Sequence, residues 1–457
     1  MVLLAVCVFA PLSLYADGID AYVMSQLKER HIPGAAVAVI QKGRVVKIKG
    51  YGLASIEFNA PVTTKTAFEI GSVSKQMTAA AIMLLVEDGK VGLDEPVSKY
   101  LVGTPDTWKN VTIRHLLTHS SGVKSYTSLD GFELIKRQKV TDFLKKLGPH
   151  PLEFTPGERN IYSNSGFTIL AYVIEAVSGK PYMEFMRERI FRPLGMASTT
   201  DRDPEYIIPN RATGYEWRLD NRYAGRDWDL TDLLGAGTIV STIEDMVKWD
   251  AALNGKKFLK PSSRAEWWKA YTFNNGQPSI YGFGWRLSDL RGHKIIGHTG
   301  QTSGFNSVNN RYVDDGLSII ILTNTGESGL AAQLANRIAK FYTPSVSLAA
   351  MKTVAGQDAK HEQAFKAALS SRLTNKPDAA TLSPSLIRAI STPGAKNTNK
   401  RLSRYGDPIA IDLVGKSTID VSERLLYRVK TRKHLHLWRV AYDADGKLNE
   451  MTLIEEE

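Results

Sequence analysis

Ser72 and Lys75 stand three residues apart at the head of a long apolar run, in the sequence "FEIGSVSKQMTAAAIMLLVEDGK" (residues 68–90). We expect a helix from Ser72 to Asp88, closed by Gly89, on which positions i and i+3 share a face. Because its residues are apolar on nearly every side, the helix should be buried, and a buried lysine is costly unless it is paired or has a lowered pKa. Such a lysine could help to remove the proton of Ser72, and the N–H groups at the helix N-terminus would favour an oxyanion. The alternative is a lysine with a purely structural role.

A second polar pair, Tyr162 and Asn164, lies in "PGERNIYSNSGF" (residues 156–167). A tyrosine close to an ammonium group can have a lowered pKa and act as a general base. The amide of Asn164 could hold a lysine or a substrate carbonyl. Taken alone, the pair also fits a turn with a core tyrosine.

A third group follows an apolar strand in "KIIGHTGQTSGF" (residues 294–305), where His298 and Thr299 precede Gly300 and Gln301. A small residue such as Gly300 would let a substrate lie along the strand edge by main-chain pairing. The N–H of Gln301 could then serve as a second oxyanion donor, and one such donor is worth about 10²–10³ in rate. The alternative is an ordinary loop histidine.

The three groups, in this order, resemble the motifs of the serine β-lactamase and penicillin-binding protein superfamily, in particular its class C-like branch of D,D-carboxypeptidases, D-aminopeptidases and esterases. The family motifs Ser-x-x-Lys, Tyr-x-Asn and Lys/His-Thr-Gly match here as Ser72/Lys75, Tyr162/Asn164 and His298/Thr299/Gly300. Further family-like phrases occur at residues 93–101, 113–123, 193–196 and 237–249. The resemblance covers about residues 20–342. It implies an acyl-serine enzyme with Ser72 as nucleophile, in which Lys75 and Tyr162 share the proton transfers. The additional glutamate of the class A branch has no counterpart that we identify.

Other catalytic patterns match poorly. His115 and His119 in "HLLTH" have the spacing of a zinc-ligand pair but lack the intervening glutamate of the metalloprotease pattern. The phrase "GAGTIV" (residues 235–240) lacks the third glycine of a dinucleotide fingerprint, and no Gly-x-Ser-x-Gly elbow occurs. We therefore expect neither a metal nor a cofactor.

The expected elements place these motifs in an α+β fold. Two apolar runs around Lys42-Gly43 predict a β-hairpin, residues 280–324 predict an antiparallel meander, and 328–342 a terminal helix. A sheet built from both ends of the domain, flanked by helices and with a mainly helical region (about 95–235) inserted, suits this order. We assign residues 17–344 to the hydrolase domain.

The remaining segments predict a linker at 345–360 and a small C-terminal α+β accessory domain at 361–457. Within it, 362–373 and 383–390 should form short helices, 391–407 a loop, and 425–454 strands with a turn at Asp445-Gly446. The sequence does not indicate whether this domain binds a ligand, gates the substrate or makes an oligomer contact. The oligomeric state is equally open.

The N-terminal sequence, the cysteine content and the net charge limit the expected cellular location and binding partners. The first 16 residues resemble a signal peptide cleaved near Ala16, which predicts an exported, periplasmic or secreted protein without stable membrane insertion. Cys7 is the only cysteine, so the mature chain would have no disulfide and no thiol nucleophile. The net charge of +11 is spread along the chain without a basic stripe bearing aromatic residues, which argues against nucleic-acid binding. The expected partner is a small molecule or a peptide, for example one derived from the cell wall.

His298 bears on the substrate, because β-lactamases carry a lysine at the equivalent motif position, and its charge helps to bind the β-lactam carboxylate. A histidine with an ordinary pKa near 6.5 is mostly neutral at pH 7. This favours a hydrolase of D-amino-acid-containing peptides or small esters over a β-lactamase. A non-catalytic scaffold or binding module is the third alternative. The presence of all four residues of the first two motifs argues against it, since binding alone does not require an activated serine.

Overall fold

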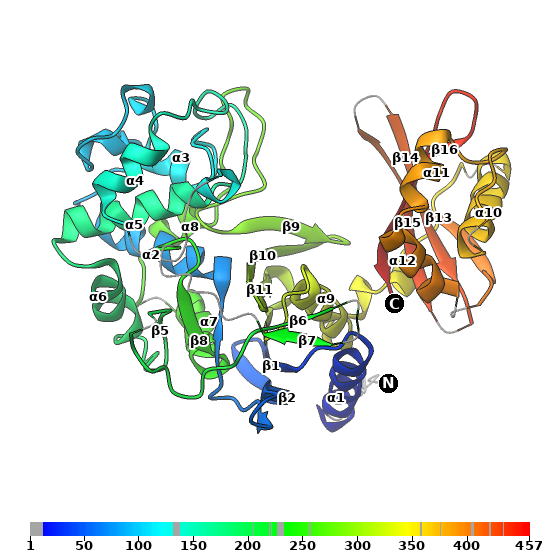
Figure 1. Ribbon diagram of the computed structural model, residues 1–457, viewed down its shortest axis with the longest axis horizontal. Coiled ribbons are helices and arrows are strands. Elements are labelled where there is room, and N and C mark those ends of the chain that lie inside the picture. Colours follow the sequence, from blue (N-terminus) through cyan, green and yellow to red (C-terminus); the bar gives the residue numbers. More distant parts are fainter. Residues whose placement is uncertain are drawn as a thin grey trace, which may run out of the picture. The chain divides into compact units, whose positions relative to one another are not determined.

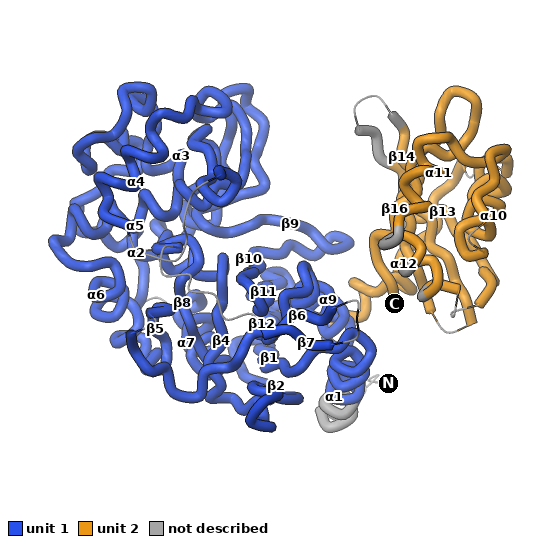
Figure 2. The backbone as a smooth tube through the Cα atoms, in the orientation of Figure 1, with its two compact units in different colours: residues 1–342 blue, residues 343–457 orange. Residues whose placement is uncertain are grey.

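The computed structural model describes residues 12–130, 138–203, 205–218, 220, 222–225, 233–255, 257–356, 359–374, 376–403, 406–419, 422–432 and 434–457. The chain divides into two compact units, Met1–Tyr342 and Thr343–Glu457 (Figure 2). Most of the predicted signal peptide (residues 1–16) lies outside the described residues, and its last five residues begin helix α1 (Leu12–Glu29). Among the described residues, no helix is both long and apolar enough to cross a membrane.

A seven-stranded antiparallel sheet forms the base of the first unit, in the order β3-β2-β1-β12-β11-β10-β9 (Figure 1). The strands are β1 (Gly34–Gln41), β2 (Arg44–Ser55), β3 (Ala60–Pro61), β9 (Arg286–Leu290), β10 (His293–Thr302), β11 (Phe305–Tyr312) and β12 (Leu317–Thr323). The predicted hairpin at Lys42-Gly43 is present, and both turn residues have positive φ, as a tight two-residue hairpin requires. Pairing of β1 with β12 joins the two ends of the unit, which confirms the predicted fold class.

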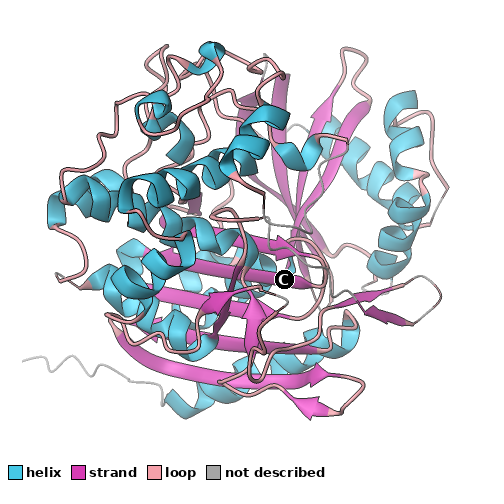
Figure 3. Cartoon of the chain, turned by 60° about the vertical axis from the view of Figure 1, so that its left-hand side comes forward, coloured by secondary structure: helices cyan, strands magenta, loops and turns pink. Residues whose placement is uncertain are grey.

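Helices cover both faces of this sheet, which is why its central strands are apolar on both sides (Figure 3). Alternate residues such as Ile320 and Leu322 join the main core, with α7 (Ile243–Asn254) packed on β1 and β12. Helix α9 (Leu330–Tyr342), the predicted terminal helix, packs on β11, β12 and α1. The sheet is therefore a rigid layer that can hold the edge strands β10 and β9 in a fixed position.

The region between β3 and β9 is mainly helical, as predicted. Its α-helices are α2 (Ser74–Glu87), α3 (Ile113–Leu117), α4 (Val140–Leu147), α5 (Asn164–Ser178), α6 (Tyr182–Met186), α7 and α8 (Pro261–Trp267), with a π-helix at Arg187–Phe191. Short strands form two small sheets: β4 (Ala67–Glu69), β8 (Ile239–Thr242) and β5 (Thr200–Asp201), then β6 (Tyr215–Trp217) and β7 (Tyr223–Gly225). Helix α2 packs against α5, so the motifs at the start of these two helices are brought together.

The C-terminal unit is a separate α+β domain with its own core. Helices α10 (Ala359–Leu373), α11 (Pro384–Ile390) and α12 (Pro393–Ser403) accompany a four-stranded antiparallel sheet of β13 (Ala410–Ile419), β14 (Ser422–Lys430), β15 (Leu435–Tyr442) and β16 (Leu448–Glu456). Phe365, Tyr427 and Trp438 lie at the centre of its core.

Two expectations for this part of the chain differ from the structure. Residues 391–407 include the helix α12 instead of a continuous loop, because Leu402 is buried in the core and Asn399 Oδ1 accepts a hydrogen bond from a buried arginine at 2.7 Å. The segment predicted as a linker (345–360) contains the 3-10 helix Leu348–Ala350, whose Leu348 is buried against Val414 and Leu437. In each segment a single buried leucine contacts the rest of the domain. One such residue in a polar segment does not produce the periodic pattern from which a helix is predicted.

Candidate active site

Ser72 lies in a single 3-10 turn, Gly71–Val73, that leads directly into helix α2. The predicted helix therefore begins as a tighter turn, with its α-helical part starting at Ser74. Gly71 has a φ of +49°, and a Cβ at this position would come within 2.7 Å of the Gln301 nitrogen. Only glycine allows the serine turn and strand β10 to lie this close.

The side chain of Lys75 is completely buried and is surrounded by three oxygen atoms. Its Nζ lies 3.0 Å from Ser72 Oγ and donates to Asn164 Oδ1 and to the Ala236 carbonyl, each at 2.8 Å. Burial lowers the pKa of Lys75 well below its usual value. A neutral amine has two N–H groups for the two carbonyl-type acceptors and one lone pair for the Ser72 hydroxyl. The surroundings of Lys75 therefore suit a neutral base directed at Ser72.

Tyr162 is the second partner of the serine, and its hydroxyl donates to Ser72 Oγ at 2.7 Å. The Nζ of Lys75 lies 4.7 Å from the centre of the Tyr162 ring. The expected lowering of the tyrosine pKa is not found, because burial raises the pKa of Tyr162 above its usual value. The neutral phenol is consequently a hydrogen-bond donor at rest, which leaves Lys75 as the group able to accept the serine proton.

Asn164 is the first residue of α5, and its Oδ1 holds the lysine amine. Its Nδ2 donates to Thr127 Oγ1 at 3.2 Å, which fixes the orientation of the amide. Of the two interpretations offered by the sequence, the structure shows the contact with the lysine, and the contact with a substrate carbonyl stays a prediction.

The third motif lies on an open edge of the large sheet. Strand β9 pairs with β10 only from His293 to Gly297, so among the described strands none pairs with this edge of β10 from His298 onward. The β10–β11 pairing ends at Thr302 opposite Phe305 across a two-residue turn. Because hydrogen-bonded pairs alternate in an antiparallel ladder, the main-chain groups of Thr299 and Gln301 are directed to the open edge. The Gln301 N–H next to the serine turn is consistent with its predicted role as an oxyanion donor.

Gly300 and His298 have different roles from those that their types first suggest. A Cβ on Gly300 would lie 1.9 Å from the Ile70 carbonyl oxygen, so the glycine allows β10 to pack on the serine turn instead of making room for substrate. The His298 side chain is buried, and its Nδ1 lies 2.6 Å from the Thr299 carbonyl oxygen, so Nδ1 carries the proton. Burial is the largest cause that lowers the pKa of His298 to about 3, and the imidazole is neutral at pH 7.

Three further contributors were not recognised in the sequence. The Ala236 carbonyl binds Lys75 through the main chain, which no residue type can signal. Tyr281 packs 6.3 Å from Tyr162, between ring centres. The exposed Arg286 forms an isolated main-chain bridge with Tyr281 and pairs with Gly297, next to His298 on strand β10. A cation within a polar strand is too common for its position to have been informative.

The two histidines with zinc-ligand spacing, His115 and His119, make hydrogen bonds to different residues. The Nδ1 of His115 accepts from the Thr112 N–H, and its Nε2 lies 3.1 Å from the Tyr271 hydroxyl. The Nδ1 of His119 accepts from the Ser163 N–H at 3.2 Å. Within the described part of the chain, no group of three or more histidine, cysteine or acidic residues is arranged to hold a metal ion.

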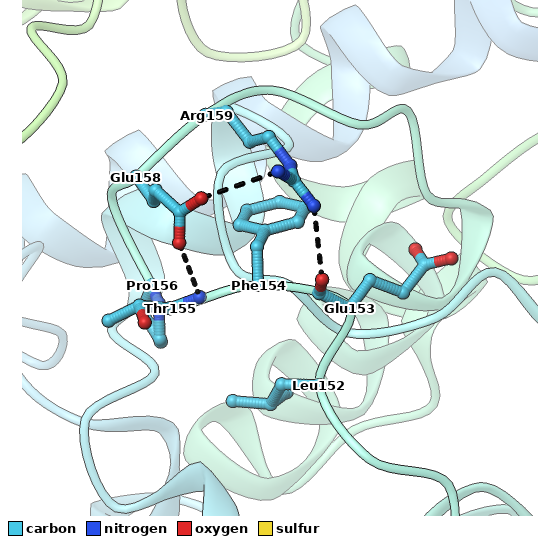
Figure 4. A pocket seen from close by; sticks show the side chains of 7 residues that line it. All are labelled: Leu152, Glu153, Phe154, Thr155, Pro156, Glu158 and Arg159. Carbon is cyan, nitrogen blue, oxygen red and sulfur yellow. Dashed lines mark hydrogen bonds and ion pairs between the residues drawn. The ribbon is translucent and has the colours of Figure 1, made fainter.

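A surface pocket lies on the loop that precedes Tyr162, between Leu152 and Arg159 (Figure 4). The Arg159 guanidinium lies over the Phe154 ring and donates to the Glu153 carbonyl at 3.2 Å. None of the three sequence motifs lines this pocket. We regard these contacts as a support for the loop and not as part of the site.

Comparisons with known proteins agree with the fold. A family model described as Beta-lactamase matches residues 19–343. Penicillin-binding protein 4* of Bacillus subtilis is 32% identical over 321 residues, which cover 66% of this chain and 70% of that protein. A D-aminopeptidase of Brucella anthropi is 28% identical over 312 residues, which cover 66% of this chain and 59% of the relative. The solved D-amino acid amidase of Ochrobactrum anthropi SV3 has a TM-score of 0.61 and 27% identity, covering 74% of this chain and all of that one.

The half-buried Ser72 and Tyr162 meet the buried Lys75 beside strand β10, and the family model and relatives point to a serine hydrolase of the β-lactamase and penicillin-binding protein type. With the family model matched over most of the first unit, this chain belongs to the β-lactamase family. The resemblance noted in the sequence is thereby confirmed.

Proposed function

We propose that this protein hydrolyses amide or ester bonds of D-amino-acid-containing compounds through an acyl intermediate on Ser72. The observation that carries the proposal is the position of Ser72 Oγ, 2.7 Å from the Tyr162 hydroxyl and 3.0 Å from the buried Lys75 amine. A scaffold has no need of an unprotonated lysine directed at a serine. The binding-module alternative is disfavoured for this reason.

Acylation begins with transfer of the Ser72 proton to the neutral Lys75 amine while Oγ attacks the substrate carbonyl carbon. The N–H groups of the serine turn and of Gln301 stabilise the resulting oxyanion. As the oxyanion collapses, Tyr162 gives its proton to the leaving amine or alkoxide, and the Lys75 ammonium returns a proton to the phenol. Water then attacks the ester carbonyl by the same route in reverse, which releases the acid and restores Ser72.

The substrate class rests on two further observations. His298 presents a neutral imidazole where a lysine would offer a fixed charge, which disfavours the carboxylate of a β-lactam. Relatives named for D-aminopeptidase and D-amino acid amidase activities share the fold with this chain. We therefore rank peptides, amides and small esters of D-amino acids above β-lactams, which are the alternative substrates.

A substrate panel tests the proposal. Purified wild-type protein and Ser72→Ala are compared on D-aminoacyl amides, D-Ala-D-Ala peptides, p-nitrophenyl esters and a chromogenic cephalosporin. We expect turnover of the first three classes above that of the cephalosporin, with loss of turnover in Ser72→Ala. Equal turnover by both proteins would remove Ser72 as the nucleophile. Turnover of the cephalosporin alone would favour the β-lactamase alternative.

A further inference from the structure

His119 makes an unusual set of contacts with the segment that carries Tyr162. Its carbonyl oxygen accepts from the Ile161 N–H at 3.1 Å, and its Nδ1 accepts from the Ser163 N–H at 3.2 Å. In an extended segment, the N–H groups of residues i and i+2 point the same way, so His119 holds the N–H groups of the two residues on either side of Tyr162. In a regular sheet, a carbonyl oxygen of the neighbouring strand would accept the Ser163 N–H. Here His119 Nδ1 takes the place of that carbonyl.

The ring of His119 also supports the phenol directly. Its centre lies 4.3 Å from that of Tyr162 and 5.0 Å from that of Tyr281. The side chain is buried, and burial lowers its pKa well below the usual value, so the unprotonated Nδ1 needed as an acceptor is maintained. Protonation of Nδ1 would remove the hydrogen bond to Ser163.

The backbone of His119 is held in a conformation that histidine seldom adopts. Its φ is +56°, in the left-handed region, where a residue with a Cβ is disfavoured. Residues persist in this region when surrounding contacts over-determine them, and such positions concentrate at functional sites. Here the left-handed turn directs both the carbonyl and the imidazole of one residue toward the same segment.

We propose that His119 is a positioning residue for Tyr162, which holds the N–H groups of Ile161 and Ser163 on either side of the tyrosine so that the phenol reaches Ser72 Oγ at hydrogen-bond distance. This inference rests on the proposed function for its catalytic consequence. The contacts themselves do not depend on which substrate is used. His115, one helical turn earlier, has other partners and serves as an internal control.

Three substitutions separate the ring nitrogen from the backbone conformation. His119→Ala removes the acceptor and keeps the disfavoured φ, whereas His119→Gly removes the acceptor but accepts positive φ without strain. His119→Asn keeps an acceptor oxygen close to the position of Nδ1 and tolerates the left-handed region. The rate constant and the half-saturation concentration for labelling of Ser72 by a fluorescent phosphonate are measured for each variant, with His115→Ala as the control.

We expect the maximal labelling rate constant to fall roughly 10- to 100-fold in His119→Ala and His119→Gly, as for a catalytic group displaced by about 1 Å, with little change in half-saturation. His119→Asn should recover most of the rate, and His115→Ala should label like wild type. Labelling of His119→Ala at the wild-type rate, or recovery in His119→Gly equal to that in His119→Asn, would overturn the inference.

Hydrogen exchange at the Ser163 amide provides a readout that needs no activity. We expect faster exchange at this amide in the alanine and glycine variants and near wild-type exchange in His119→Asn. Exchange that is unchanged in His119→Ala would disprove the proposed contact. A wild-type protein that is not labelled at Ser72 would instead refute the proposed function, so the two failures are distinguishable.

Discussion

Each of the two units buries a basic side chain, Lys75 in the first and Arg372 in the second. In both, burial lowers the pKa below the ordinary value. Arg372 donates to Asn399 Oδ1 at 2.7 Å and to the Met451 carbonyl at 2.9 Å, and it lies over the Trp438 ring. It thereby ties α10 to α12 and β16, while Lys75 ties α2 to α5 and to the Ala236 loop.

The two buried side chains differ in whether they can lose their proton and in which group lies at hydrogen-bond distance. A guanidinium keeps its proton in proteins even when buried, whereas an amine can lose it. Lys75 has a serine hydroxyl at 3.0 Å, whereas the acceptors of Arg372 are an amide and a carbonyl. Burial of a cation is therefore not by itself a sign of catalysis. The combination of a titratable cation with a nucleophile at hydrogen-bond distance is the informative feature.

Replacing each buried cation by methionine is the strongest test of this contrast. In Lys75→Met we expect phosphonate labelling of Ser72 to slow about 10²–10⁴-fold, because the base is lost. In Arg372→Met we expect unchanged labelling and a loss of about 2 kcal/mol in stability, because two buried acceptors lose a charged donor. Labelling rates and urea unfolding of both variants check these outcomes. A slow-labelling but well-folded Arg372→Met protein would break the contrast.

Removing the Tyr162 hydroxyl should have the next largest effect. We expect Tyr162→Phe to lower kcat about 10²-fold on amide substrates, since the proton donor to the leaving group is lost while Lys75 remains. An ester with a p-nitrophenolate leaving group needs little protonation and should lose less. Steady-state kinetics on a matched amide and ester of the same D-amino acid provide the measurement. Equal losses on both would indicate a role for Tyr162 in activating the serine instead.

Changing the charge at position 298 should shift substrate preference by a smaller factor. We expect His298→Lys to raise kcat/KM for an anionic β-lactam about 10-fold, because a charged donor to a carboxylate replaces a neutral ring. A neutral ester of similar size serves as the control and should not gain. Unchanged β-lactam turnover in a folded variant would show that the charge argument is wrong.

The acid stability of the first unit tests the burial of His298 without any substrate. The folded pKa of His298, about 3, lies below its unfolded value near 6.5, so the unfolded chain binds the proton first as pH falls. The stability contributed by the neutral ring is present above pH ~6.5 and is lost as pH falls toward about 3. We expect His298→Asn to reduce the slope of unfolding free energy against pH by about 1.4 kcal/mol per pH unit in this window. Chemical unfolding of wild type and His298→Asn from pH 6 to 4 provides the measurement. Equal slopes of unfolding free energy against pH in the two proteins would contradict this assignment.

The sequence predicted which residues form the candidate site better than it predicted their protonation states. The spacing of Ser72 and Lys75 on one helix face, and the apolar residues around them, were sufficient to expect a buried lysine. The raised pKa of Tyr162 was not, because it depends on how deeply the phenol is buried once α5 has packed on α2. The Ala236 carbonyl and the left-handed backbone of His119 leave no trace in residue type. Fold class followed from periodicity, whereas α12 depends on tertiary anchors within a polar stretch.

Strand β9 begins opposite Gly297, and this limits the length of the β10 edge with which another chain could pair. An uncovered edge strand is a template for unwanted pairing, and proteins usually keep such edges short. Here the stretch of β10 that pairs with no other described strand on this side runs from His298 to Thr302, where the hairpin turn begins. At about 3.3 Å per residue it spans only some 15 Å, enough for a short peptide but too little for a stable added strand. The same truncated neighbour that leaves room for a substrate thus limits the risk of self-association through this edge.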